Sequence, residues 1–338
     1  MKKIGIALVG LGPGAEPHLA SLAALNDQVE LRWGVTRSGN LRREGLLPSG
    51  TRLTADLGEA LADARVDVVV LATPANTHLA LARQTLAAGK HTLVEKPLDV
   101  SLQRAEELVQ LAEASGLCFG VVLQHRFRPG AVRLRALLAS GALGELQAGM
   151  LQVPWWRSQA GYYDQAGRGT RARDGGGVLL TQAVHSLDLF RSLVGVRGVV
   201  AAQVRTTAVH AIETEDFASA LLTLGNGAPG SVMATTAMYP GRTESIELIY
   251  ADAQVSLVGG GLQVHHHDGR TEVVEGDEKT GSGDAIMDFS PAAHTALYRD
   301  FLDAVAHHRP PLVSGREALL THRLIEEILS AGAGDPPR

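Results

Sequence analysis

Residues 4–15 read IGIALVGLGPGA and decide the fold expected for this chain. The apolar run Ile4–Val9 is followed at once by glycines and then by an amphipathic pattern, which is the order strand, turn, helix. Three small residues stand at the spacing of the dinucleotide-binding fingerprint, which accepts alanine at its third position. Such a turn lets the backbone and a helix N-terminus approach a pyrophosphate. The expected cofactor contacts are therefore Gly10, Leu11, Gly12, Pro13, Gly14 and Ala15.

The same alternation continues to residue 124. Apolar runs typical of strands lie at 29–35, 66–72, 91–94 and 119–123, with apolar residues at helical spacing between them. This order predicts an α/β Rossmann domain with a doubly wound parallel sheet. From residue 125 a helix, a glycine-rich segment and a series of strands predict an α+β domain with a mainly antiparallel sheet. The expected ranges are 1–124 for the dinucleotide-binding domain, 125–330 for the second domain and 331–338 for a tail.

Composition narrows the class of protein. Of 338 residues, 45% are hydrophobic and 20% charged, which is typical of a packed globular protein. The net charge of -5, without a basic block, argues against non-specific nucleic-acid binding. The apolar run after Lys2 and Lys3 is short for a secretory signal, and no stretch is long enough to span a membrane. With a single cysteine, Cys118, expected to be a buried strand residue, these features favour the cytoplasm.

The end of the second expected strand bears on the choice of nicotinamide cofactor. NAD enzymes place an Asp or Glu there, which binds the ribose 2′-hydroxyl. This chain has Thr36, Arg37 and Ser38 instead. The hydroxyls can hydrogen-bond, and the guanidinium can pair with a 2′-phosphate. The pattern favours NADP over NAD, although Arg37 could equally be a solvated surface residue.

Four further motifs occur in order along the chain. They are VDVVVLATPANTH at 66–78, AAGKHTLVEKPL at 87–98, QHRFRPG at 124–130 and DGGGVLLTQAVHSLD at 174–188. Together with residues 298–319, they make the chain resemble the glucose–fructose oxidoreductase, inositol dehydrogenase and rhizopine-catabolism (Gfo/Idh/MocA) family over nearly its whole length. The ordered pair of EKP and GGG…HxxD is much more specific than the glycine turn.

The resemblance implies a Rossmann domain, an open-faced sheet domain and an active site between them. It implies oxidation or reduction of a hydroxyl or ketone on a sugar, cyclitol or sugar nucleotide, and homodimers or homotetramers that pack through the open sheets. It places Lys96 by the nicotinamide and the reacting oxygen, and makes His185 an acid–base group or substrate ligand. Further cofactor contacts are expected in these motifs at Ala72, Thr73, Pro74, Asn76, His78, Glu95, Lys96 and Gln124.

The chemistry of the reaction supports these two catalytic residues independently. Removal of hydride from a carbinol needs a group that takes the hydroxyl proton and a cation that stabilises the developing alkoxide. A partly desolvated lysine can do both, and a histidine titrates in the required range. Family members commonly carry an aspartate four residues before the histidine, where this chain has Thr181. On one helix Thr181 and His185 would share a face, but Thr181 adds no negative charge, so His185 is then less basic or binds substrate.

Aromatic residues make up only 4% of the chain, yet four of them fall within 155–163. Rings beside polar donors suit a sugar, although a packed loop or a subunit interface explains them equally well. The expected substrate contacts are Trp156, Arg157, Tyr163, Arg168, Thr181 and His185. The acidic residues Glu213, Glu215 and Asp216 are expected to be solvated or structural. The run His265-His266-His267 is expected to be a hairpin tip and not a metal site, because adjacent strand residues point to opposite faces.

Two other functions stay open at this stage. An enzyme of the same fold could retain its cofactor and cleave or epimerise a sugar within one cycle of oxidation and reduction. A non-catalytic dinucleotide-sensing regulator would be expected to lack Lys96 or His185, and both are present.

Overall fold

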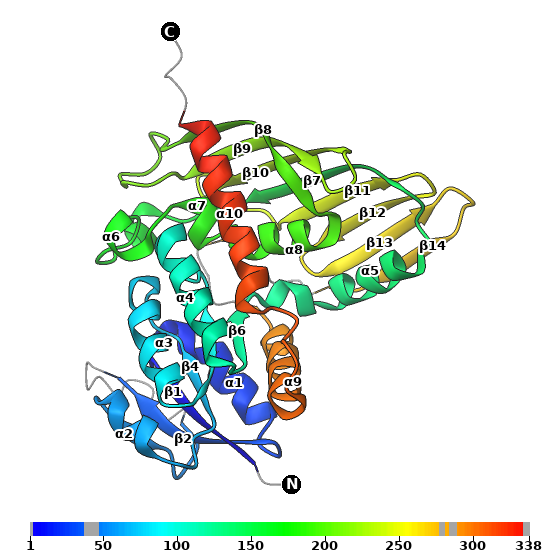
Figure 1. Ribbon diagram of the computed structural model, residues 1–338. Coiled ribbons are helices and arrows are strands. Elements are labelled where there is room, and N and C mark those ends of the chain that lie inside the picture. The colour runs from blue at the N-terminus through cyan, green and yellow to red at the C-terminus, as the bar shows by residue number, and fades with distance from the viewer. Residues whose placement is uncertain (1–2, 37–46, 277–280, 284–288, 334–338) are drawn as a thin grey trace. The chain divides into compact units, whose positions relative to one another are not determined.

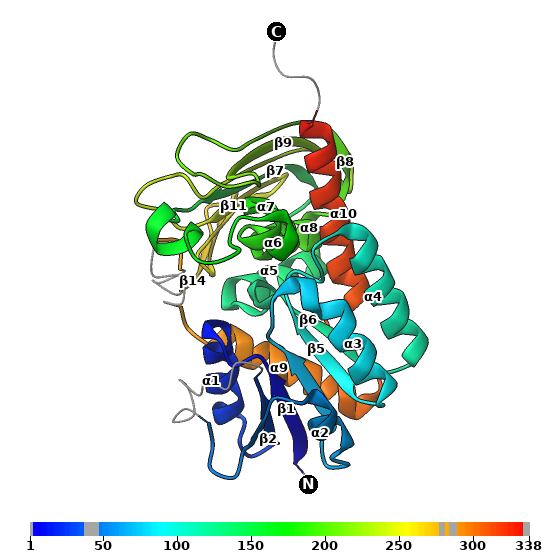
Figure 2. The same ribbon diagram turned by 90° about the vertical axis from the view of Figure 1, so that its left-hand side faces the viewer.

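The computed structural model describes residues 3–36, 47–276, 281–283 and 289–333 (Figure 1). The chain divides into two compact units. Unit 1 comprises Met1–Gln124 and Pro291–Leu319, and unit 2 comprises His125–Ser290 and Leu320–Arg338. The ranges expected from the sequence put residues 291–319 in the second domain. In the structure they belong to unit 1, because α9 (Ala292–His307) packs along α1 (Glu16–Ala24), as Figure 2 shows.

Unit 1 contains a six-stranded sheet in the order β3-β2-β1-β4-β5-β6. All its neighbouring strands run parallel, which confirms the predicted Rossmann sheet. The strands are β1 (Ile4–Val9), β2 (Val29–Val35), β3 (Arg52–Thr54), β4 (Val68–Leu71), β5 (His91–Glu95) and β6 (Phe119–Val122). Besides α1 and α9, its helices include α2 (Leu57–Ala62), α3 (His78–Ala87) and α4 (Leu102–Ser115).

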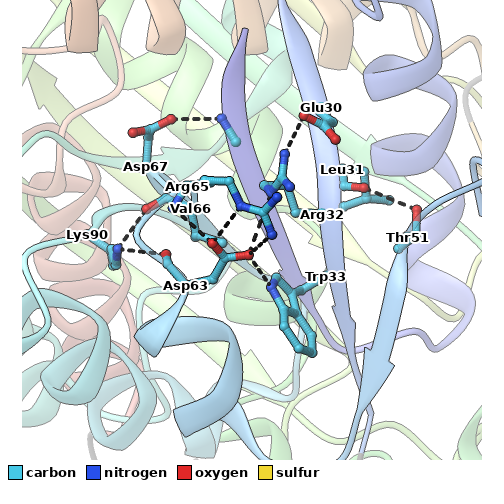
Figure 3. A network of polar contacts seen from close by, with 11 residues as sticks. Glu30, Leu31, Arg32, Trp33, Thr51, Asp63, Arg65, Val66, Asp67 and Lys90 are labelled. Carbon is cyan, nitrogen blue, oxygen red and sulfur yellow. Dashed lines mark hydrogen bonds and ion pairs between the residues drawn. The ribbon is translucent and has the colours of Figure 1, made fainter.

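Local sequence explains the ends of these elements. β4 is buried at every position, which suits a strand covered by helices on both faces. The α4 helix begins after Ser101, whose hydroxyl accepts the Arg104 N–H, and ends at Gly116 in the left-handed conformation. At the amino-terminal side of the sheet, Asp63 accepts hydrogen bonds from Trp33 and Arg65, as Figure 3 shows. These contacts tie β2 to the segment that leads into β4.

Unit 2 contains an eight-stranded sheet in the order β14-β13-β12-β11-β7-β10-β9-β8. Every pairing is antiparallel except that of β10 with β7, which confirms the predicted mainly antiparallel sheet. The strands are β7 (Leu146–Pro154), β8 (Val196–Arg205), β9 (Phe217–Leu224), β10 (Pro229–Thr235), β11 (Ser245–Tyr250), β12 (Ala253–Val258), β13 (Gly261–His266) and β14 (Thr271–Val274).

Helices cover one face of this sheet. They include α5 (Pro129–Ser140), α7 (Val178–Thr181) and α8 (Val184–Val194), which contact β13, β9 with β10, and β7 respectively (Figure 1). A short helix, α6 (Arg171–Asp174), precedes α7, and α10 (Gly315–Gly332) is the last helix. On the opposite face, alternate positions carry exposed apolar side chains, including Met150, Leu221 and Ile249.

Two further observations concern the described residues only. His266 lies at the end of β13 and is buried, and its Nε2 lies 3.2 Å from Glu272 Oε1. No group of three or more His, Cys, Asp or Glu among the described residues is arranged to hold a metal ion. None of the helices in the described ranges combines the length and the apolar character needed to cross a membrane.

Candidate active site

The glycine turn lies where the carboxyl ends of β1, β2 and β4 meet. Gly10 has a φ of +96°, and a Cβ added there would lie 2.4 Å from Ala72 O, so only glycine fits. The Gly10 N–H donates to Val35 O at 2.9 Å, and the Ala72 N–H donates to Val9 O at 2.8 Å. The turn therefore brings Thr36, which follows Val35, and Ala72 to the same edge of the sheet as the fingerprint.

The rest of the turn fits a pyrophosphate. Gly12 and Gly14 are exposed, nothing lies within 4 Å of a Cβ added to either, and their N–H groups have no acceptor among the described residues. One turn of 3-10 helix, Pro13–Ala15, leads directly into α1, and Ala15 is fully buried against the sheet. Free amides at a helix entrance with open space above them are what a dinucleotide phosphate requires.

The structure tests only one of the three residues expected to choose between NADP and NAD. Thr36 is half-buried, and its N–H donates to Thr54 O at 2.9 Å, which extends the pairing of β2 with β3. Arg37 and Ser38 lie outside the described residues. Preference for NADP therefore stays a prediction.

The 73–78 segment divides into exposed and buried parts. Pro74 and Asn76 are exposed, and the Thr73 and Thr77 hydroxyls lie 2.7 Å apart. His78, in contrast, is fully buried. Its Nε2 lies 2.9 Å from Thr73 O, and its Nδ1 lies 3.0 Å from Pro97 O and 3.1 Å from Leu98 O. His78 therefore links this turn to the EKP loop instead of reaching a ligand itself.

Lys96 follows β5 at the carboxyl edge of the sheet and is half-buried. Its backbone N–H donates to Glu95 Oε2 at 3.0 Å, and the Lys96–Pro97 peptide bond is cis. Three residues further on, the buried Asp99 accepts from the Leu79 N–H and from the Arg104 guanidinium. Contacts on both sides thus fix the backbone that carries the lysine.

In unit 2 the triple-glycine segment is held by a buried carboxylate. A Cβ at Gly177 would lie 1.8 Å from Glu215 O, so this position requires glycine. The side chain of Glu215 accepts the Gly177 N–H at 2.9 Å and the Leu179 N–H at 3.1 Å. Burial raises the pKa of Glu215, and these backbone hydrogen bonds oppose the increase. Glu215 is thus one of the acidic residues with a structural role.

The helix expected to carry both Thr181 and His185 is broken between them. α7 ends at Thr181 and α8 begins at Val184, because the Ala183 N–H donates to Val178 O, one residue further back than in a regular helix. The Thr181 hydroxyl donates to Gly177 O at 2.7 Å, so its single proton is committed to the backbone. The expectation of one continuous helical face was therefore wrong.

His185 lies in the first turn of α8 and is 9% exposed. Its ring stacks on His125, with centroids 5.0 Å apart and planes inclined by 28°. The next residue, Arg126, makes a two-pronged ion pair with the fully buried Asp188, at 2.6 and 2.7 Å. The QHR and HxxD motifs therefore contact each other twice. Gln124, which ends the first segment of unit 1, is buried.

The aromatic segment is largely committed to internal packing. Arg157 is 3% exposed and donates to Gln182 Oε1 and to the carbonyl oxygens of Trp156, Gly281 and Gly283. The Tyr163 hydroxyl is buried and lies 2.8 Å from Thr236 Oγ1, and burial raises its pKa.

Trp156 and Arg168 are only half-buried, and the Arg168 guanidinium lies over the Tyr162 ring. Of the two readings of this segment, packing explains Arg157 and Tyr163, while Trp156 and Arg168 stay available to a ligand.

Sequence reasoning missed the histidine partners of two acidic residues, Asp216 and Glu95. In unit 2, His210 Nδ1 lies 2.7 Å from Asp216 Oδ2, and both side chains are fully buried. In unit 1, Glu95 contacts His18, which in turn contacts Tyr298. No local pattern marks His18 and Tyr298 as neighbours of Glu95, because they come from α1 and α9.

Comparison with known proteins agrees with this architecture. The model of an oxidoreductase family with an NAD-binding Rossmann fold matches residues 4–123, and that of the GFO/IDH/MocA C-terminal domain matches residues 131–256. The chain belongs to the Gfo/Idh/MocA oxidoreductase family. The resemblance inferred from the motifs is thereby confirmed.

Individual relatives differ in how much of their length is matched. UDP-N-acetylglucosamine 3-dehydrogenase of Acidithiobacillus ferrooxidans is 30% identical over 76% of each chain. Uncharacterised oxidoreductases of Synechocystis and Escherichia coli are 28% and 30% identical, over 63% and 57% of this chain. This chain spans less than two thirds of the length of these two relatives, 62% and 54%.

Among solved structures, the WlbA dehydrogenase of Chromobacterium violaceum, in complex with NADH and UDP-GlcNAcA, has a TM-score of 0.83 and 27% identity. That alignment covers 98% of this chain and 94% of the other. The Bordetella pertussis WlbA dehydrogenase, with the same ligands, has a TM-score of 0.84 at 26% identity, covering 98% and 96%.

Proposed function

We propose that this protein transfers a hydride between a nicotinamide dinucleotide and a hydroxyl or ketone of a sugar, cyclitol or sugar-nucleotide-like substrate. The observation that carries the proposal is that Lys96, on a fixed backbone, lies at the same edge of the parallel sheet as a glycine turn whose free amides fit a pyrophosphate. The named relatives that act on or bind a UDP-sugar support the substrate class.

In this proposal each residue of the site has a separate role. The amides of Gly12 and Gly14 hold the pyrophosphate of the cofactor, whose nicotinamide exchanges the hydride. Lys96 takes the proton of the reacting hydroxyl, or returns it, and its cationic form stabilises the alkoxide. His185 binds or protonates the substrate, and Trp156 and Arg168 contact it. Arg157 and Tyr163 shape the neighbouring loop.

Cofactor choice follows from the residues after β2. Thr36, Arg37 and Ser38 follow Val35 and include no carboxylate, so the proposed preference is for NADP, with Arg37 pairing with the 2′-phosphate. The test compares the dissociation constants of NADPH and NADH, measured by fluorescence, in the wild type and in Arg37→Asp. Replacement by Asp should shift the ratio toward NADH by at least about tenfold, equivalent to one charge-assisted contact of about 1.4 kcal/mol. An unchanged ratio would remove the argument for NADP.

The activity is tested by a substrate screen. Sugar nucleotides, free sugars and cyclitols are incubated with NADP or NAD, and reduced nicotinamide is followed by its absorbance. With the best substrate, Lys96→Ala should lose at least about a hundredfold in kcat, the usual contribution of a general base. Lys90→Ala is the matched control, because Lys90 donates to Asp63 O and Val66 O at the amino-terminal side of the same sheet. Undiminished turnover in Lys96→Ala would overturn the proposal.

We also propose that the exposed face of the unit 2 sheet is a subunit interface in a homodimer or homotetramer. Met150 pairs with Glu247 and Ser231, and Ser231 pairs with Leu221, so exposed apolar side chains share one face across neighbouring strands. Leu221 is 57% exposed. Leu221→Glu should shift the sedimentation coefficient toward that of a monomer, and an unchanged coefficient would place the interface elsewhere.

A further inference from the structure

Two buried residues of unit 1, Tyr298 and His18, and the half-buried Glu95 form a chain of hydrogen bonds that ends at the backbone of Lys96. The Tyr298 hydroxyl lies 2.8 Å from His18 Nδ1, and His18 Nε2 lies 2.9 Å from Glu95 Oε1. The other carboxylate oxygen of Glu95 accepts the Lys96 N–H at 3.0 Å. His18 and Tyr298 are 0% and 1% exposed, whereas the Glu95 side chain is 19% exposed. Helices α1 and α9 thus meet the end of β5 at one carboxylate.

The chemistry of the three groups sets the direction of the hydrogen bonds. Burial raises the pKa of Tyr298 well above its ordinary value, so its hydroxyl keeps its proton. A carboxylate only accepts hydrogen bonds. Tyr298 O–H can therefore donate to His18 Nδ1 while His18 Nε2–H donates to Glu95, and both helices hold the carboxylate in one orientation.

The charges around Glu95 keep it ionised. Burial alone would raise the pKa of Glu95, but the hydrogen bond from His18 and the positive charge of Lys96 act in the opposite direction, and the pKa is lowered. Lys96 thus stabilises the Glu95 carboxylate. An attraction between two charges acts on both, so the carboxylate favours the protonated form of Lys96 to the same extent.

We propose that Glu95, oriented by His18 and Tyr298, is a positioning residue that fixes the Lys96 backbone and sets the protonation of its side chain. The inference rests on the proposed function, which gives Lys96 the proton-transfer role. It also accounts for a site with Thr181 in place of an aspartate, because the position four residues before His185 supplies no carboxylate. The charge that adjusts the proposed proton-transfer group then comes from Glu95, on the lysine side.

The test reads the protonation of Lys96 directly and needs no substrate. The chain has five lysines, at 2, 3, 90, 96 and 279, so the ε-carbon signals of ¹³C-lysine protein are few enough to resolve. Lys96→Arg identifies the Lys96 signal, and its pH titration gives a midpoint in the cofactor-free enzyme. Glu95→Gln keeps the shape but removes the charge, and should lower that midpoint by about one pH unit. Glu95→Asp, which keeps the charge, should have a midpoint close to that of the wild type.

Ser21→Ala is the matched control for packing. Ser21 is fully buried on α1, and its hydroxyl lies 3.2 Å from that of Thr295 on α9, so it belongs to the same helix contact without touching Glu95. This variant should lower the melting temperature but leave the Lys96 midpoint where it is. If Glu95→Gln also leaves the midpoint within about 0.2 pH units of the wild type, Glu95 has only a structural role and the inference fails.

A second measurement keeps the inference testable if Glu95→Gln does not fold. In the wild-type protein the Lys96 signal should show a further small step below pH 4.5, the ordinary value for a glutamate, as Glu95 is protonated. A signal that is flat there would overturn the inference. The two proposals can fail separately. Full turnover in Lys96→Ala refutes the catalytic role of Lys96. If Lys96→Ala is inactive but the Lys96 midpoint is the same in Glu95→Gln as in the wild type, only the role of Glu95 is refuted.

Discussion

Replacing Asp188 by asparagine should destabilise unit 2 strongly. Asp188 is fully buried and accepts hydrogen bonds from Arg126 at 2.6 and 2.7 Å and from the Thr321 hydroxyl at 2.8 Å. The Arg126 side chain is only 4% exposed, so it has no access to water when its partner loses its charge. Breaking a buried ion pair in this way costs about 3–5 kcal/mol, most of it from the charge left without compensation.

The assay is urea unfolding followed by tryptophan fluorescence. The chain has three tryptophans, of which Trp33 lies in unit 1 and Trp155 and Trp156 lie in unit 2. In a Trp33→Phe background the signal therefore reports unit 2 alone, and the free energy of unfolding comes from linear extrapolation.

Two comparisons show whether the buried charge is the cause. Arg270→Gln removes an ion pair to Asp268 in which both side chains are more than half exposed, and should cost less than about 1 kcal/mol. The double variant Arg126→Met/Asp188→Leu replaces the pair by apolar groups and should be more stable than Asp188→Asn. A loss below about 1 kcal/mol for Asp188→Asn, or a double variant less stable than it, would refute the reasoning.

Three further predictions concern stability and reactivity. Gly177→Ala should abolish cooperative thermal unfolding or lower its midpoint sharply, because its Cβ would overlap Glu215 O, whereas Gly198→Ala, with nothing within 4 Å, should behave like the wild type. Hydrogen bonds from Arg65 lower the pKa of Asp63 well below its ordinary 3.8, so ionised Asp63 stabilises the folded protein above pH 3.8 and loses this effect as the pH falls further. The difference in unfolding free energy between wild type and Asp63→Asn should therefore shrink below pH 3.8. A constant difference would contradict this. Burial raises the pKa of Cys118 to about 12, so at pH 8 Ellman's reagent should react about a thousandfold more slowly with folded than with unfolded protein.

Features that depend on residues close together in the chain could be predicted from the amino-acid sequence. The glycine turn was predictable because a tight turn, a close packing contact and a helix start each require a particular residue type at a fixed spacing. Continuous apolar runs identified five of the six parallel strands but not the three-residue β3, and the EKP and GGG…HxxD motifs identified the family. Local chemistry left the acidic residues before β9 as either solvated or structural, and the folded structure assigns Glu215 a structural role.

Features that depend on residues far apart in the chain became visible only in the folded structure. His18 and Tyr298 are separated by 280 positions, and their contact with each other beside Glu95 arises because α9 packs in unit 1 beside α1. The break between Thr181 and His185 follows from the shifted backbone hydrogen bond from Ala183 to Val178, which no residue type in the sequence predicts. Arg157 was expected at a substrate because an arginine among aromatic rings suits a sugar, but folding brings carbonyl oxygens of the 281–283 segment to its guanidinium. A side chain's hydrogen-bonding groups are available to a ligand only when the folded chain does not already satisfy them, and that condition is set by three-dimensional packing.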